Sequence, residues 1–158
     1  MKVDKIIKST VKEELEIIGA TLLSIEEAEE YLTRVERAYD CWWWLCSPSC
    51  FSYCATLVYC DGDIIGYGDS VHDGGICVRP ALQIKNLESS NFEIGNTFQI
   101  DDYEFKIISD NLAWMYKQDI GHYAFNEDYE KGNDYETSDV KKVVDKWFKD
   151  LLIFNESK

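Results

Sequence analysis

The sequence lacks the long apolar run that a membrane span requires. None of its hydrophobic stretches approaches the roughly 18 consecutive apolar residues of a transmembrane helix. Its first residues, Met1 to Lys8, interrupt a short apolar pair with charges, unlike the continuous apolar core of a signal peptide. We therefore expect a protein that stays in the cytoplasm.

Positive charge is also scarce. Sixteen Lys and Arg residues stand against 30 Asp and Glu, which leaves a formal net charge of −14 at pH 7, and the isoelectric point is about 4.4. A chain of this sign is repelled by nucleic-acid backbones and by anionic membranes. Direct binding to either is disfavoured, and a protein partner with a basic surface is favoured.

Recognisable catalytic motifs are missing as well. The chain has only two histidines, His72 and His122, to act as a general base, and no glycine-rich phosphate loop links a strand to a helix. The aspartates near residues 61–73 do not have the spacing of a calcium-binding EF-hand loop. We expect no enzymatic activity; a cysteine-dependent enzyme using Cys46 or Cys50 with His72 is the least favoured class.

What the chain does have points to one α+β domain over residues 1–158. A length of 158 residues with 46% hydrophobic composition suits a single core. The patterns predict about three helices packed with short antiparallel strands and hairpins: helices over 3–18, 25–37 and from 138 on, strands over 53–59, 63–68 and 76–84, and a meander over 96–116. The polar segment 85–91 divides the domain into parts 1–85 and 92–158.

Six cysteines lie within one stretch of 37 positions, between Cys41 and Cys77. Their spacing does not follow the paired CxxC pattern of zinc knuckles, but Cys46 and Cys50 flank a turn and could join His72 and Cys77 around a zinc ion. The alternative is that the thiols are small apolar core residues and that the protein has no cofactor.

Acidic and aromatic residues gather between residues 127 and 139, where six acids accompany a single base. Such a loop could present carboxylates to a basic groove in place of phosphates. Tyrosines bury much area at low entropic cost, so they suit contact positions. The expected partner-binding residues are Glu127, Asp128, Tyr129, Glu130, Asp134, Tyr135 and Glu136.

Two motifs carry a family resemblance. Residues 43–48 (WWLCSP) and 75–82 (GICVRPAL), with a hairpin between them, resemble the WWLRSP and GVRPAL signature of an uncharacterised family of bacterial and phage domains. Residues 22–28 are similar to the LLSxxE segment that precedes this signature. Cys46 stands where the family pattern has arginine. The resemblance implies a fold like that of C-type lectins and of formylglycine-generating proteins.

The order of the segments differs from the family pattern. Residues 95–98, 105–108 and 135–140 are similar to segments that normally come before the tryptophan motif, whereas here they follow it. A circular permutation explains this order if the two ends of the parent domain are neighbours in space. A fusion of two partial modules would explain it as well.

The composition and the resemblance together predict a non-enzymatic acidic binding protein. The most specific expectation is a phage protein that inhibits a nucleic-acid-binding defence nuclease in the host cytoplasm, as an anti-CRISPR protein does, through carboxylates that compete with nucleic acid. The alternative is a lectin-like module that holds a glycan or another small ligand at Trp43, Tyr67 and Asp69.

Overall fold

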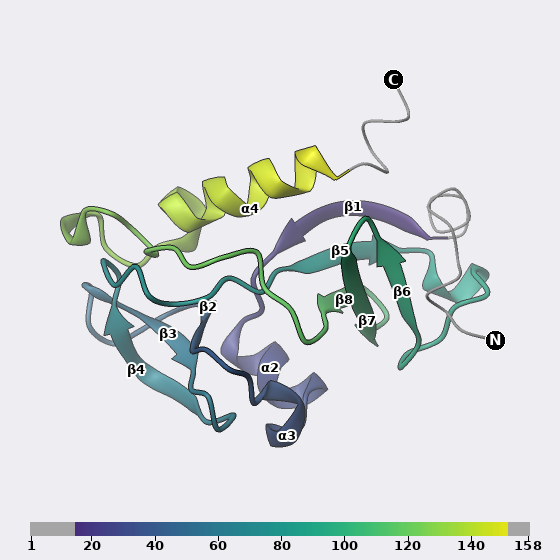
Figure 1. Cartoon of the computed structure of the whole chain (residues 1–158), viewed down its shortest axis with the longest axis horizontal. Helices are drawn as coiled ribbons and strands as arrows, with labels where there is room; N and C mark the ends of the chain where they lie inside the picture. The colour runs from purple at the N-terminus through teal and green to yellow at the C-terminus, as the bar shows by residue number, and fades with distance from the viewer. Residues whose placement is uncertain (1–14, 152–158) are drawn as a thin grey trace. The chain divides into compact units, whose positions relative to one another are not determined.

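The computed structural model describes residues 15–151, which combine eight strands with three α-helices in an α+β arrangement (Figure 1). The elements are, in chain order, β1 (Glu16–Thr21), α2 (Ile25–Tyr31), α3 (Arg34–Arg37), β2 (Trp43–Pro48), β3 (Cys54–Val58), β4 (Ile64–Ser70), β5 (Ala81–Lys85), the 3-10 helix η2 (Leu87–Ser89), β6 (Thr97–Ile100), β7 (Tyr103–Ser109), β8 (Leu112–Met115), the 3-10 helices η3 (Tyr129–Lys131) and η4 (Tyr135–Thr137), and α4 (Asp139–Asp150). None of the helices in this part of the chain is long and apolar enough to cross a membrane.

The described residues form two compact units. Unit 1 contains residues 15–21, 80–118 and 145–151, and unit 2 contains residues 22–79 and 119–144. Each unit therefore takes segments from both sides of the predicted division at residues 85–91.

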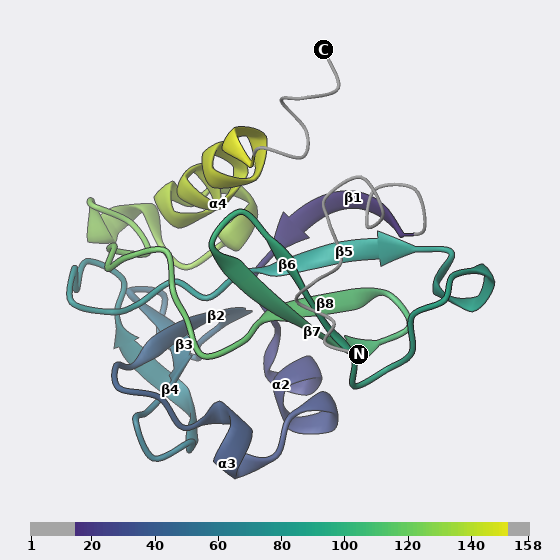
Figure 2. The same cartoon turned by 45° about the vertical axis from the view of Figure 1, so that its right-hand side comes forward.

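Unit 1 is built on an antiparallel sheet of five strands in the order β1-β5-β8-β7-β6 (Figure 2). The predicted meander over 96–116 is confirmed as β6, β7 and β8. The predicted helix over 3–18 is wrong at its end, where Glu16 begins β1 and Ile17 pairs with Ile84 of β5. Its remaining residues up to 14 lie outside the described part. Short apolar runs with interspersed charges fit a helix and a strand equally, and pairing with β5 decides between them.

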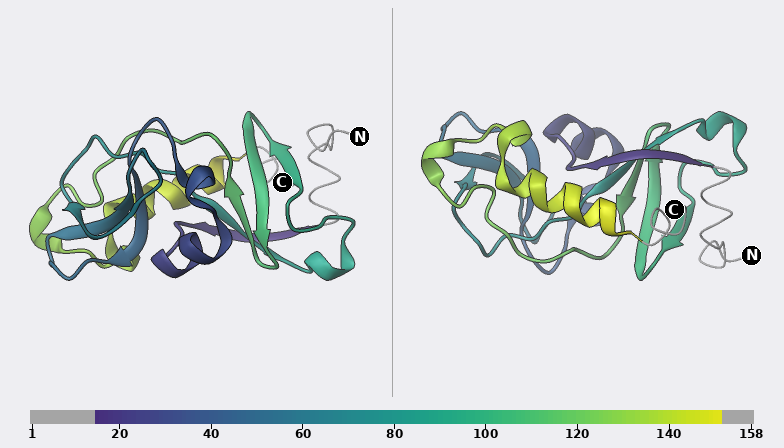
Figure 3. Two further views of the ribbon diagram at one scale, coloured as in Figure 1. Left: turned by 90° about the horizontal axis from the view of Figure 1, so that it is seen from below. Right: turned by 90° about the horizontal axis from the view of Figure 1, so that it is seen from above.

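Unit 2 is built on the three-stranded sheet β2-β3-β4, with α2 and α3 before it in the chain (Figure 3). The predicted Asp61-Gly62 turn joins β3 to β4, and Gly62 has a φ of 91°. A Cβ atom there would clash with the Arg34 carbonyl oxygen, so only glycine fits. The predicted helix over 25–37 is two helices, because Leu32 and Thr33 are extended and Thr33 caps α3.

The predicted strand over 76–84 is divided between the two units. Cys77 forms bridges to Trp43 and His122 in unit 2, whereas β5 begins at Ala81 in unit 1. Pro80 between them has no N–H group with which to continue a ladder. The chain therefore changes sheet at this proline.

The predicted C-terminal helix is confirmed as α4, and the Ser138 hydroxyl accepts a hydrogen bond from the Lys141 N–H group (3.0 Å). Its first half belongs to unit 2, where Val140 and Val144 are fully buried. Its second half belongs to unit 1, where the Trp147 ring lies 5.6 Å from the Tyr103 ring.

Candidate functional site

The residues with the clearest functional character in unit 2 are the acidic ones between 127 and 136, called the acidic loop below. Two Asp-Tyr-Glu triplets, residues 128–130 and 134–136, each form the start of a 3-10 helix. The Asp128 carboxylate accepts a hydrogen bond from the Glu130 N–H group (3.0 Å), and Asp134 does the same for Glu136 (3.1 Å). All five expected carboxylate residues are exposed, namely Glu127, Asp128, Glu130, Asp134 and Glu136.

Two asparagines hold the acidic loop in place. The Asn133 amide group donates to the backbone carbonyls of Ser49, Phe51 and Cys54 at 3.0–3.1 Å. The Asn126 side chain is fully buried; it donates to the Gly132 carbonyl (2.8 Å) and accepts from the Asp139 N–H group (2.9 Å). The loop is thereby fixed to the β2–β3 connection and to the start of α4. Nothing in the sequence pattern distinguishes these two amides from ordinary surface asparagines.

Lys131, the single basic residue of the loop, pairs with a carboxylate just beyond the loop. Lys131 forms an ion pair with Asp139 (2.8 Å), which also accepts a hydrogen bond from the Glu127 N–H group (2.8 Å). Both interactions stabilise the charged carboxylate and hold the pKa of Asp139 below its usual value. The ion pair with Asp139 offsets the charge of Lys131, so the loop keeps the negative charge of its five exposed carboxylates.

The two tyrosines of the triplets occupy different environments. Tyr129 is 55% exposed and can serve as the expected contact residue. Tyr135 is only 7% exposed, and its ring lies 6.4 Å from the buried Phe125 ring. The expectation that Tyr135 contacts a partner is therefore corrected: it is a core residue under the loop.

The expected small-ligand site at Trp43, Tyr67 and Asp69 does not have an accessible indole at Trp43. Trp43 is 0% exposed, and its indole N–H donates to the Arg37 carbonyl (3.0 Å). The buried guanidinium of Arg79 covers its ring at 4.9 Å, and burial lowers the pKa of Arg79 to about 10. Trp43 is thus corrected from a ligand contact to a core residue. Tyr67 is exposed and Asp69 half-buried, as a surface site would require.

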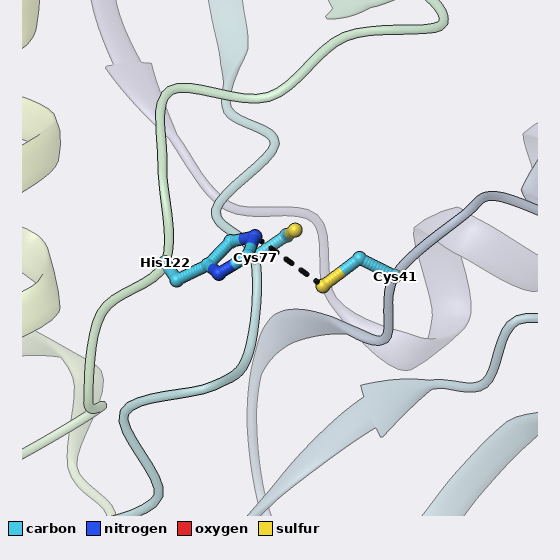
Figure 4. Close-up of side chains that lie close together, drawn as sticks. All are labelled: Cys41, Cys77 and His122. Atoms are coloured by element: carbon cyan, nitrogen blue, oxygen red, sulfur yellow. Dashed lines mark hydrogen bonds between the residues drawn. The ribbon is translucent and has the colours of Figure 1, made fainter.

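The expected zinc ligands are not brought together. No three of Cys46, Cys50, His72 and Cys77 have their donor atoms within 4.8 Å of one another. Cys50 and His72 are exposed loop residues, whereas Cys46 lies in β2, where burial and the nearby Glu27 raise its pKa to about 12. This corrects the sequence-based donor set and also makes Cys46 a poor nucleophile. Cys77 instead lies beside Cys41 and His122 (Figure 4).

Comparison with known proteins gives one match. Residues 11–86 match the model of a family described as a domain of unknown function, DUF6273, over slightly less than half of the chain. No curated protein and no solved structure matches the chain. The matched stretch contains both motifs of the resemblance described above and ends just after β5.

Proposed function

We propose that this protein is a non-enzymatic binding protein whose acidic loop docks onto a basic surface of a macromolecular partner. The observation that carries the proposal is the combination of five exposed carboxylates with a backbone fixed by Asn126 and Asn133. An ordered loop loses little conformational entropy on binding, so more of the electrostatic attraction appears as affinity. The exposed Tyr129 of the loop adds apolar contact area.

The specific partner class that we propose is a nucleic-acid-binding nuclease of a host defence system. Carboxylates on a fixed scaffold can occupy the lysines and arginines that otherwise hold guide or target strands, as in an anti-CRISPR protein. The chain's net charge of −14 would speed its association with such a surface at low salt. A cytoplasmic location in the infected cell follows from this role.

We also propose that the fold is a circularly permuted member of the family with the tryptophan signature, with a C-type-lectin-like architecture. The family match ends at residue 86, before the segments that resemble the beginning of the family pattern. Described residues near both ends of the chain, 15–21 and 145–151, belong to unit 1. A cut within one continuous unit would leave both new ends in that unit, so this placement supports a permutation.

The test compares two variants with the same change in charge. E127Q/E130Q/E136Q removes three charges from the acidic loop but keeps the capping residues Asp128 and Asp134. The control E26Q/E29Q/E30Q removes three exposed charges from the α2 segment. Three exposed ion pairs at about 0.5 kcal/mol each correspond to about a tenfold loss of affinity for the loop variant.

The probe is a panel of purified RNA-guided nucleases, each measured with and without its guide RNA at low and high salt. We expect wild type and the α2 control to bind and to inhibit cleavage, and the loop variant to bind about tenfold more weakly with a smaller salt dependence. Equal inhibition by the two variants would refute the role of the loop. Failure of every nuclease to bind would refute the proposed partner class.

A further inference from the structure

Three donor groups converge in unit 2, on residues that do not belong to the acidic loop. The Sγ atoms of Cys41 and Cys77 and a ring nitrogen of His122 all lie within 4.8 Å of one another, with Cys41 Sγ 3.8 Å from His122 Nε2 (Figure 4). Cys77 is buried, Cys41 is half-buried and His122 is exposed. The cluster is therefore rooted in the core and open to solvent on the histidine side.

Backbone pairing places these three residues together. Cys77 lies in a short extended segment between the start of β2 and residues 120–123, with bridges to Trp43 on one side and to His122 on the other. Five backbone hydrogen bonds of 2.8–3.1 Å hold this arrangement. From N–H group to carbonyl, they are Trp44 to Cys77, Cys77 to Trp42, Val78 to Gly121, Ile120 to Val78, and Tyr123 to Ile76. The donors thus sit on three segments whose register is fixed independently of any ligand.

We propose that Cys41, Cys77 and His122 bind a zinc ion. In a tetrahedral zinc site with bonds of about 2.3 Å to sulfur and about 2.05 Å to nitrogen, neighbouring sulfur and nitrogen atoms lie about 3.6 Å apart. The Cys41–His122 distance of 3.8 Å is close to this value, and the other two donor pairs lie within 4.8 Å, so the donors need to approach one another by no more than about 1 Å to bind the ion. Two sulfurs and one imidazole are also the ligand types that select zinc over calcium or magnesium.

The charge balance of the site agrees with a divalent ion. Binding of Zn²⁺ displaces one proton from each thiol, and the resulting two thiolates neutralise the ion. Asp119, whose carboxylate interacts with the Cys77 thiol, is itself held by the Tyr39 hydroxyl (2.5 Å) and the Gly121 N–H group (2.8 Å). The buried Arg79, over the Tyr39 ring at 4.1 Å, offsets the charge of this carboxylate. Water takes the fourth position on the solvent side.

A catalytic cysteine–histidine pair explains the cluster less well. Such a pair needs one thiolate and one base, and Cys41 with His122 would suffice. The second thiol, Cys77, is buried directly beside them and has no part in that chemistry. It is, however, the third donor that a metal site requires.

The experiment uses the full-length chain, reduced and freed of metal with a chelator, and titrates it with Co²⁺ and Zn²⁺. We expect Co²⁺ to give sulfur-to-metal charge-transfer bands and the ligand-field spectrum of a tetrahedral site, and one equivalent of Zn²⁺ to abolish both. C41S and H122A should weaken binding of Zn²⁺ by more than about 100-fold, since loss of an outer-shell partner alone costs 10- to 100-fold. The matched controls C50S and H72A replace exposed residues outside the cluster and should bind as wild type does.

H122A keeps the test independent of folding, because His122 is exposed and its replacement leaves the backbone bridges intact. Circular dichroism of each variant verifies this. Binding of Zn²⁺ by wild type that is no tighter than binding by C41S and H122A would overturn the proposal. A reduced chain that takes up no Zn²⁺ but forms a Cys41–Cys77 disulfide in air would overturn it as well. The outcome does not depend on the acidic loop or on its partner.

Discussion

Replacement of Asn133 tests how much the order of the acidic loop depends on this amide, one of the two that hold the loop in place. The Nδ2 group of Asn133 has two hydrogens and contacts three backbone carbonyls, so Asn133→Ala removes about two hydrogen bonds. At about 0.5–1.5 kcal/mol each, the free energy of unfolding should fall by about 1–3 kcal/mol. Asn133→Asp loses the same bonds and also turns an anion toward three carbonyl oxygens, so it should be less stable than Asn133→Ala at pH 7.

Urea denaturation followed by tryptophan fluorescence measures this order of stabilities. Ser52→Asp is the matched control, because it adds the same charge at an exposed position in the segment that Asn133 contacts. An anion that faces carbonyl oxygens has a raised pKa in the folded state, so the penalty of Asn133→Asp should shrink as the pH falls toward about 4, where a protonated carboxyl group can donate to one of the carbonyls. An Asn133→Asp variant that is more stable than Asn133→Ala at pH 7 would refute the reasoning.

The same variant separates charge from order in partner binding. Asn133→Asp makes the surface more negative, so charge alone predicts tighter binding to a basic partner, whereas loss of loop order predicts weaker binding. We expect weaker binding, with the salt dependence largely retained.

Two further predictions concern single side chains. Asp139→Asn should lower the free energy of unfolding by about 1 kcal/mol at pH 7, since Asp139 pairs with Lys131 at the first turn of α4. Because the pKa of Asp139 is lowered in the folded state, its contribution to stability should be complete above about pH 4 and disappear as the pH falls further. A difference in stability between wild type and Asp139→Asn that persists at pH 2 would contradict this. At pH 8, iodoacetamide should modify the exposed Cys50 before Cys46, because the Cys46 pKa of about 12 leaves little thiolate. Peptide mass spectrometry measures the two rates, and equal rates would count against the burial of Cys46.

Local signals in the sequence predict local structure well. Ser24 and Glu27 form the predicted capping box, with both reciprocal hydrogen bonds present at 3.1 and 2.9 Å. A second box, formed by Thr33 and Glu36, starts α3 and was available in the sequence, but the continuous apolar stripe over 25–37 concealed it. The break between α2 and α3 was therefore predictable, and the missed signal was the cap.

Contacts between residues far apart in the chain could not be predicted from the sequence. Cys41 and His122 are 81 residues apart, so no spacing rule connects them, and they meet because both flank the extended segment around Cys77. The acidic loop was visible as composition, whereas the burial of Tyr135 depends on its packing against Phe125. The two Asp-Tyr-Glu triplets have the same local pattern, and only tertiary contacts distinguish their tyrosines.

The placement of β2 in unit 2 means that this strand is synthesised well before a residue that it contacts. The Trp44 indole N–H donates to the carbonyl of Tyr123, which is synthesised 79 residues later. At about 5–20 residues per second, this interval lasts roughly 4–16 s. During that time the apolar β2 segment lacks its contact with residue 123. We therefore expect a chaperone to bind this part of the nascent chain.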